Sequence, residues 1–434
     1  MATVVLLGTL DTKGREYEFL REQVRAAGCE ILLVDGGVMG PPQVVADITA
    51  DEVARAAGEE RAALAASGDR GAAVEAMSRG AAVVLERLHA AGRLHGVLGM
   101  GGSGGSSLIS GAVRGLPIGV PKLIVSTMAS GDTRPFVGSS DIGLMNAVVD
   151  IAGINGVSER ILGNAAAAMA GMARHYAGFV PRASGKPRIG ATMFGVTTPC
   201  VDEARARLEA LGYEVLVFHA NGSGGRAMEA LMAGGQISGA LDVTTTELVD
   251  EVVGGILSAG PERLEMAGSQ GLPQVVSLGA LDMGNFGPMD TVPERYRGRN
   301  LCRHNAATTL MRTTPEECAA VGRLMAAKLN RALGPLTLFI PLRGFSAIGT
   351  DGGVFHDPKA DAALIGELKA GLDPGVEVVE MDTGINDPAF ANAMAQRLHE
   401  HYQEWAGRPR PGEQDSAADL KEAREQRLKA VARP

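Results

Sequence analysis

A glycine-rich segment is the part of this sequence best suited to bind a charged ligand. Residues 99–107 read GMGGSGGSS and stand between an apolar, strand-like run and a stretch with helical character. Glycines at such a junction expose consecutive backbone N–H groups, which can hold phosphate oxygens near the positive end of the helix dipole. The sequence therefore predicts an anion-binding loop, with a merely flexible loop as the alternative, at Gly101, Gly102, Ser103, Gly104 and Gly105.

The same loop satisfies the G-x-G-x-x-G pattern of dinucleotide-binding proteins through Gly99, Gly101 and Gly104. The match is weak, because the loop follows the third predicted strand instead of the first and no acidic residue closes the next strand. The loop is also similar to the Gly-Gly-Asp-Gly loop of phosphofructokinase-type and NAD kinases. Ser103 stands where the aspartate of those kinases would be.

A second candidate loop ends the first predicted strand, where residues 8–14 read GTLDTKG. Its glycines permit a tight turn, its threonines offer hydroxyl groups and Lys13 could neutralise a phosphate. It is not a Walker A loop, because no Gly-Lys-Ser/Thr follows. A helix-capping turn with Asp11 or Thr12 at the N-cap is the alternative. The residues assigned to nucleotide binding here are Gly8, Thr9, Asp11, Thr12, Lys13 and Gly14.

A third candidate loop follows the fourth predicted strand, where residues 126–135 read STMASGDTRP. Asp132 could hold Mg²⁺ or a ribose hydroxyl, and Arg134 could make a bidentate phosphate contact. Thr127 and Gly131 complete this part of the predicted nucleotide site. An ordinary Asp–Arg pair at the surface is the alternative.

Asp35 ends the second predicted strand, where a Rossmann ribose-binding acid would stand. The fingerprint that normally accompanies such an acid is missing from the first turn. In the second half, residues 219–225 read HANGSGG and form another candidate anion loop. Residues 242–247 read DVTTTE, where Thr245 or Thr246 could cap the next helix.

Cys200 is a candidate nucleophile in the second half. Thr198 and Pro199 are typical of a helix N-terminus, which places Cys200 in the first helical turn, where the pKa of a thiol tends to fall. His304 and Arg343 lie at further predicted strand ends, and with Cys200 and Asp132 they form the candidate catalytic set. The alternatives are a small buried cysteine and ordinary surface loops.

Short apolar runs that favour strands alternate with helical stretches, and these elements must position the loops. The predicted strands are residues 3–7, 30–34, 96–100 and 121–126, then 188–193, 213–218, 239–242, 274–277, 336–341 and 376–380. Helices are predicted near residues 14–27, 71–91, 105–114, 158–176 and 201–211. The pattern predicts an α/β fold of two Rossmann-like domains, with parallel sheets flanked by helices and joined by a short linker.

The predicted domains are residues 1–179, which carry the nucleotide-binding loops, and residues 187–404. The segment 178–187 reads as a linker because of its prolines, glycines and basic residues. The openings of the two halves echo one another, which indicates a diverged internal duplication. Residues 405–434 are charged and almost free of large apolar side chains, so a disordered or loosely helical tail is expected.

Composition narrows the classes of function. The 434 residues carry a net charge of −9 and no basic block before the tail, so a nucleic-acid partner is not expected. No apolar run is long enough to span a membrane. The four cysteines are scattered without a CxxC pair, which disfavours a zinc site or a disulfide framework and favours the cytoplasm.

Several motifs together resemble a known family, and they occur in order over about residues 2–404. They are residues 8–14, 101–105, 130–135, 194–200, 300–305, 310–315 and 385–388. The family comprises bacterial and fungal proteins similar to the ATP-binding N-terminal domain of the tomato mosaic virus resistance protein. The resemblance implies two Rossmann-like subdomains, ATP with Mg²⁺ at the glycine loops, and a homodimer. Two departures are Asp382-Thr-Gly384, where the family pattern has Asp-Ala-His, and Asn146, where a larger aromatic residue is expected.

The leading hypothesis is a cytoplasmic, dimeric ATP-binding protein in which Asp132 holds Mg²⁺. The alternative is an ATP-dependent enzyme of kinase, transferase or ligase type that acts on a small carboxylate or phosphorylated acid. That enzyme would need a second small-molecule site, expected between the domains. A third hypothesis is a non-catalytic module in which ATP stabilises a dimer that binds a protein partner. The residues leave open whether the protein is an enzyme, although Asp11 and Asp132 are candidate general bases.

Overall fold

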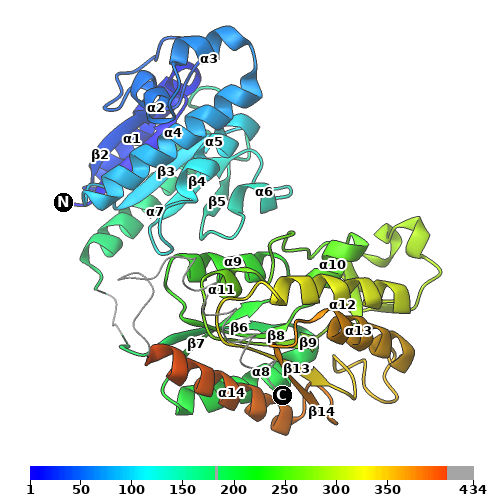
Figure 1. Ribbon diagram of the computed structural model, residues 1–434. Coiled ribbons are helices and arrows are strands. Elements are labelled where there is room, and N and C mark those ends of the chain that lie inside the picture. Colours follow the sequence, from blue (N-terminus) through cyan, green and yellow to red (C-terminus); the bar gives the residue numbers. More distant parts are fainter. Residues whose placement is uncertain (181–183, 408–434) are drawn as a thin grey trace. The chain divides into compact units, whose positions relative to one another are not determined.

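The computed structural model describes residues 1–180 and 184–407 and divides the chain into two compact units, Met1–Arg182 and Ala183–Pro434 (Figure 1). The boundary falls within the predicted linker, whose residues 181–183 lie outside the described part. The predicted tail is described only as far as residue 407. None of the helices in the described residues is long and apolar enough to cross a membrane.

The first unit is built on a five-stranded parallel sheet in the order β2-β1-β3-β4-β5. Both β1 and β3 are buried along their whole length, which is expected of parallel strands covered on both faces. The prediction located the first four strands but missed the last, whose four residues are partly exposed. The strands are β1 (Thr3–Gly8), β2 (Glu30–Asp35), β3 (Gly96–Gly101), β4 (Lys122–Ser126) and β5 (Gly143–Asn146).

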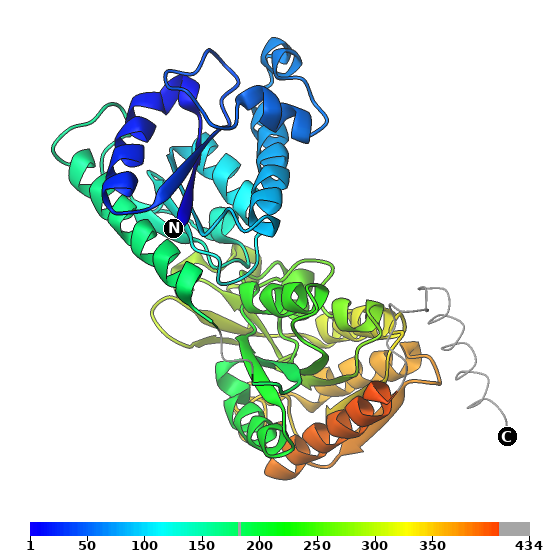
Figure 2. The ribbon, with the colours of Figure 1, turned by 90° about the vertical axis from the view of Figure 1, so that its left-hand side faces the viewer.

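Helices cover both faces of this sheet, as Figure 2 shows. On one face α1 (Leu10–Ala26) packs beside α7 (Ser158–Gly178). On the other face lie α2 (Ala50–Ala56), α4 (Arg70–Ala90) and α5 (Ser103–Val113). The short helices α3 (Arg61–Ser67) and α6 (Arg134–Val137) complete the unit. The helix α1 begins earlier than predicted, so the expected loop at residues 10–14 forms its first turn.

The second unit contains a six-stranded parallel sheet in the order β14-β13-β9-β8-β6-β7. Its strands are β6 (Arg188–Met193), β7 (Glu214–His219), β8 (Gly239–Thr244), β9 (Gln274–Gly279), β13 (Leu336–Pro341) and β14 (Glu377–Met381). A small antiparallel sheet, which was not predicted, is formed by β10 (Met283–Phe286), β11 (Leu301–Arg303) and β12 (Thr309–Arg312).

Helices also cover both faces of the second sheet (Figure 1). One face packs against α8 (Thr198–Ala210) and α14 (Pro388–Ala406). The helices on the other face are α9 (Ser223–Ala233), α10 (Glu247–Val253), α11 (Met266–Ser269), α12 (Pro315–Leu329) and α13 (Pro358–Gly371). The predicted fold class, two α/β units with parallel sheets flanked by helices, is confirmed.

The two parallel sheets share one topology. Numbered along the chain within each parallel sheet, the strands run 2-1-3-4-5 in the first sheet and 2-1-3-4-5-6 in the second. An internal duplication would produce this common order. In each sheet the chain proceeds in opposite directions from the first and from the third strand, so the topological switch point lies between these two strands. Ligands of open α/β sheets bind at the carboxyl ends of such strands.

Candidate functional site

The first unit has a cavity of about 420 Å³ at the carboxyl ends of β1 and β3, which is the topological switch point of its sheet. We call it the strand-end cavity. It brings together most of the residues predicted from the first two glycine-containing loops. Its polar lining comprises Thr9, Asp11, Thr12, Lys13, Arg70, Gly101, Gly102, Ser103, Gly104, Gly105 and Asp150, and its apolar lining includes Val38, Met39, Ala73, Val74 and Leu108.

Tyr17 joins the ends of β1 and β3, the two strands that lead into the loops of this cavity. The strands β1 and β3 pair only as far as Leu7 and Gly99. Beyond that point the buried Tyr17 hydroxyl donates to the Leu7 carbonyl at 2.6 Å and accepts from the Met100 N–H at 2.8 Å. Burial raises the pKa of Tyr17, so the phenol stays protonated. A Cβ at Gly8 would lie 1.9 Å from the Tyr17 hydroxyl, so packing alone accounts for that glycine.

The first turn of α5 supplies the donors of the cavity. The helix starts at Ser103, and Gly102 at the N-cap has no side chain with which to cap it. The N–H groups of the first turn have no partner within a helix, and they carry the positive end of its dipole. These groups belong to residues that line the cavity, so an anion entering it would meet them.

The glycines of the α5 loop differ in what the fold requires of them. A Cβ at Gly101 would lie 2.7 Å from the Gly105 Cα, so close backbone packing demands glycine there. A Cβ at Gly104 would lie 3.4 Å from Arg70 Nη2, and one at Gly102 would lie 3.7 Å from Thr127 Oγ1. Both distances are ordinary van der Waals contacts. The fold therefore has room for a side chain at Gly102 and Gly104, and their small size leaves space in the cavity.

Two basic residues line the cavity. Lys13 has non-helical backbone angles within α1 (φ −126°, ψ 21°), and its ammonium group donates to the carbonyl of Ile151. Arg70 is the exposed first residue of α4, and no carboxylate in residues 1–180 or 184–407 forms an ion pair with it. The sequence analysis missed Arg70, because nothing local separates it from other surface arginines and only the packing of α4 beside α5 brings it to the site.

Two carboxylates line the cavity as well. Asp11 Oδ2 accepts from the Met39 N–H at 2.8 Å, while Asp11 Oδ1 is buried without a hydrogen-bond partner among the described residues. Asp150, which the sequence analysis also missed, is exposed and accepts from the N–H of Ile151. The cavity therefore presents oxygen ligands beside its N–H groups and cations.

Asp35 has a structural role. Its Oδ1 accepts from the N–H groups of Leu10 at 3.0 Å and Gly37 at 2.8 Å, which ties the start of α1 to the end of β2. Burial raises the pKa of Asp35. Because this carboxylate is already engaged and does not line the strand-end cavity, a ribose-binding role for it has no support. Gly14 is likewise explained by packing, since a Cβ there would lie 2.7 Å from the Gln43 Cβ.

In the loop after β4, Asp132 was expected to bind a metal ion but is instead paired with Arg134. Arg134 Nε and Nη2 donate to the two Asp132 oxygens at 2.9 and 2.8 Å, and both side chains are more than half exposed. The hydrogen bond from Arg134 lowers the pKa of Asp132. Asp132, Arg134 and Gly131 do not line the strand-end cavity, and the pair is the surface ion pair considered as the alternative. Thr127 lies beside Gly102.

At the equivalent place in the second sheet, the threonine hydroxyl groups are bonded within the protein. Thr197, after β6, and Thr244, at the end of β8, are joined by a hydrogen bond of 2.7 Å between their buried hydroxyl groups. Thr245 and Thr246 are buried as well, and their hydroxyls donate to the carbonyls of Ser277 and Met283 instead of capping α10. No opening for a ligand follows from these residues.

An internal carboxylate occupies the second candidate anion loop. The N–H groups of Gly222 and Gly225 donate to Glu247 Oε1 at 2.7 and 3.1 Å. Arg263, which is fully buried, pairs with Glu247 at 2.5 Å and with Asp242 at 2.6 Å. The loop does bind an anion, as its sequence indicated, but the anion belongs to the protein.

The candidate catalytic residues of the second unit have different environments. Cys200 is fully buried, and burial raises the pKa of its thiol to about 12, opposite to the expected fall, which corrects the prediction of a nucleophile. Arg343 is exposed and pairs with Asp382 at 2.7 and 2.6 Å. His304 lies in the exposed turn between β11 and β12. Among the described residues, no group of three or more His, Cys, Asp or Glu side chains could hold a metal ion.

The fold and the site define a two-unit Rossmann-like protein with a cavity at the switch point of its first sheet. Family models for the N-terminal and C-terminal domains of the uncharacterised protein family UPF0261 match residues 2–178 and 186–402. The chain belongs to this family, and the resemblance found in its motifs is confirmed.

Relatives support the assignment. A UPF0261 protein of Clostridium tetani is 51% identical over 91% of this chain and 98% of its own length. The ToMV resistance protein Tm-1(GCR237) of Solanum lycopersicum is 47% identical over 69% of this chain and 41% of its own length. Among solved structures, Acinetobacter baumannii MurG aligns with 99% of this chain and 100% of its own length. The TM-score is 0.21 and the identity 10%, which is too weak a similarity to support any argument.

Proposed function

We propose that this protein binds ATP in the strand-end cavity, with the phosphates held by the backbone N–H groups of residues 102–105. One observation carries the proposal. The strand-end cavity combines a helix N-terminus that has no side-chain cap with Arg70, which forms no ion pair among the residues that the structure describes. Each feature favours an anion, and phosphate is the anion that such helix ends commonly bind. The room above Gly102 and Gly104 supports close approach of a ligand to the backbone.

The rest of the cavity suits a nucleotide. A volume of about 420 Å³ lies within the usual range for small-molecule sites. Val38, Met39, Val74 and Leu108 form an apolar wall that would pack against a base. The proposal favours a mononucleotide over a dinucleotide, because Asp35, at the position of a ribose-binding acid, is already bonded to backbone N–H groups.

Mg²⁺ would accompany the phosphates, and the residues of the cavity fit it better than the predicted Asp132 does. Mg²⁺ is usually held by one or two carboxylates together with phosphate oxygens. Asp11 and Asp150 are the carboxylates that line the cavity, and Asp11 Oδ1 is buried and unpaired. We assign the metal to these two residues. The ion would neutralise phosphate charge that Lys13 and Arg70 only partly balance.

Titration calorimetry with Mg-ATP tests the proposal. Wild-type protein should bind, and Arg70→Gln should weaken binding about tenfold or more, because it removes a charge-assisted hydrogen bond. Arg79→Gln is the matched control, since Arg79 lies on the same helix and pairs with Glu75 outside the cavity. Absence of binding to the wild type, or equal affinities of the two variants, would refute the assignment.

The second candidate function is an ATP-dependent enzyme that acts on a small carboxylate or phosphorylated acid. The environment of Asp11 favours it. Its buried, unpaired Oδ1 could accept a proton from a substrate in the cavity. Release of phosphate from Mg-ATP by the wild type would establish this activity, and its loss in Asp11→Asn would show that the Asp11 carboxylate is needed for it, as proton acceptor or as metal ligand. Binding without any release would leave the protein a nucleotide-binding module.

A cytoplasmic location and a homodimer also belong to this proposal. All four cysteines are free, which suits a reducing compartment. The homodimer rests on the family resemblance alone. Light scattering after size-exclusion chromatography, with and without Mg-ATP, tests it. A dimer whose share rises with nucleotide would support the module hypothesis, and a monomer under both conditions would contradict it.

A further inference from the structure

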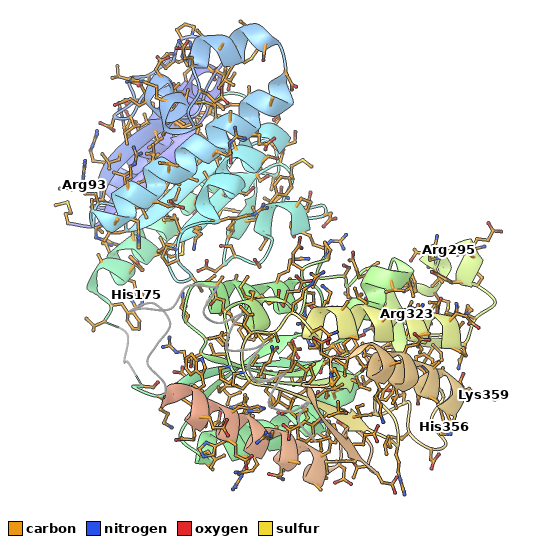
Figure 3. The ribbon with its side chains drawn as sticks, in the orientation of Figure 1. Arg93, His175, Arg295, Arg323, His356 and Lys359 are labelled. Atoms are coloured by element: carbon orange, nitrogen blue, oxygen red, sulfur yellow. The ribbon has the colours of Figure 1, made fainter. Side chains whose placement is uncertain are left out.

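A second cavity of the first unit lies away from the strand-end cavity, near the C-terminal ends of α2 and α4. It has a volume of about 510 Å³. We call it the arginine cavity, because Arg55, Arg87 and Arg93 line it and Glu52 is the one carboxylate in its lining. Figure 3 shows the Arg93 side chain extending from this end of the unit.

The charges of the arginine cavity are not balanced by ion pairs within the described residues. Glu52 is engaged in a capping box, where it accepts from the N–H and hydroxyl groups of Thr49, and these bonds lower the pKa of Glu52. Arg55 donates to the carbonyl of Asp51. For Arg87 and Arg93, no ion pair forms with any carboxylate of the part of the chain that the structure describes.

Helix dipoles offset only part of this charge. The C-terminal ends of α2 and α4 both face this region, and each contributes about half a negative charge. Together with Glu52 they oppose roughly two of the three guanidinium charges. The three exposed arginines outnumber the one carboxylate of the lining, so the cavity favours an anion.

The floor of the arginine cavity is apolar. Val84 and Leu88, on successive turns of α4, are 8% and 7% exposed and belong to the core beneath it. Ile48 and Ala56 are partly buried and complete the floor. A ligand here would place an anionic group among the arginines and an apolar body against these side chains.

We propose that the arginine cavity binds a small monocarboxylate with an apolar body. A guanidinium group can hold a carboxylate through two parallel hydrogen bonds, which favours this anion over a spherical one. Arg70 and Arg87 lie at opposite ends of α4, roughly 25 Å apart at 1.5 Å per residue. The carboxylate site is therefore separate from the strand-end cavity and does not depend on nucleotide binding there.

Calorimetry of the full chain with benzoate, acetate and benzyl alcohol as probes tests the proposal. Benzoate should bind, acetate should bind at least about tenfold more weakly because it lacks the apolar body, and benzyl alcohol should not bind. The double variant Arg87→Gln/Arg93→Gln should lose at least about tenfold in benzoate affinity. Its affinity for Mg-ATP should match that of the wild type.

Three results would overturn the proposal. They are no benzoate binding at millimolar concentration, unchanged binding in the double variant, and loss of binding in Arg70→Gln, which would move the ligand to the strand-end cavity. Arg79→Gln serves as the control for a lost charge on α4. If circular dichroism shows that the double variant is unfolded, Arg93→Gln alone gives the same test, because Arg93 lies beyond the end of the helix.

Discussion

Gly104→Ala should change folding stability and ligand affinity in opposite directions. Gly104 lies in the first turn of α5, where alanine is the better helix former. The added Cβ would meet only Arg70 Nη2 at 3.4 Å, the end of a flexible side chain. The same methyl group would enter the strand-end cavity beside the N–H groups proposed to hold phosphate.

The size of each effect follows from this geometry. Replacing glycine by alanine in a helix gains up to about 1 kcal/mol, and about half of that is reasonable in a first turn. For a unit of this size the gain corresponds to a rise in Tm of roughly 1–2 °C without ligand. Loss of one hydrogen bond to a charged phosphate costs about 1.5–3 kcal/mol, so the affinity for Mg-ATP should fall by about tenfold or more.

Thermal unfolding with and without Mg-ATP, together with calorimetry, measures both effects. Gly163→Ala in α7 is the matched control, because no atom lies within 4 Å of its Cβ position and Gly163 does not line the cavity. It should gain stability and keep its affinity. Gly101→Ala should lose stability, since its Cβ would lie 2.7 Å from the Gly105 Cα. Wild-type affinity in Gly104→Ala would refute close approach of the ligand to this backbone.

Three further predictions concern buried polar groups. Tyr17→Phe should lower the free energy of unfolding by about 1–3 kcal/mol in urea titrations, because the buried N–H of Met100 loses its acceptor. Burial raises the pKa of Asp282 to about 6. Between about pH 4 and 6 the unfolded chain therefore releases a proton that the native state keeps. Over this range the free energy of unfolding should fall by up to about 3 kcal/mol because of this group. Asp282→Asn should flatten that part of the pH profile, measured by urea unfolding at several pH values. Arg263→Met should destabilise the second unit by about 3–5 kcal/mol in calorimetric unfolding, because its carboxylate partners remain buried without a cation. A cost below about 1 kcal/mol would mean that those carboxyl groups are protonated.

Local sequence was sufficient to predict the fold class and the principal loops. Buried parallel strands are continuous aliphatic runs, so their positions can be read without knowledge of their neighbours. Because parallel strands place their carboxyl ends at one sheet edge, the loops after β1 and β3 could be assigned to one site, and both do line the strand-end cavity. The short strands β5, β10, β11 and β12 were missed, because few residues give no clear periodicity.

The sequence determined where donors and glycines occur along the chain, while tertiary structure decided which of them remain free for a ligand. Residues 219–225 carry the signature of an anion loop, but Glu247 comes from another element to satisfy it. Arg70 was indistinguishable from other surface arginines until α4 packed beside α5. Burial likewise reversed the expected pKa shift of Cys200. The physical reason is that burial and charge partnership depend on residues distant in sequence, whereas strand and turn propensities are local.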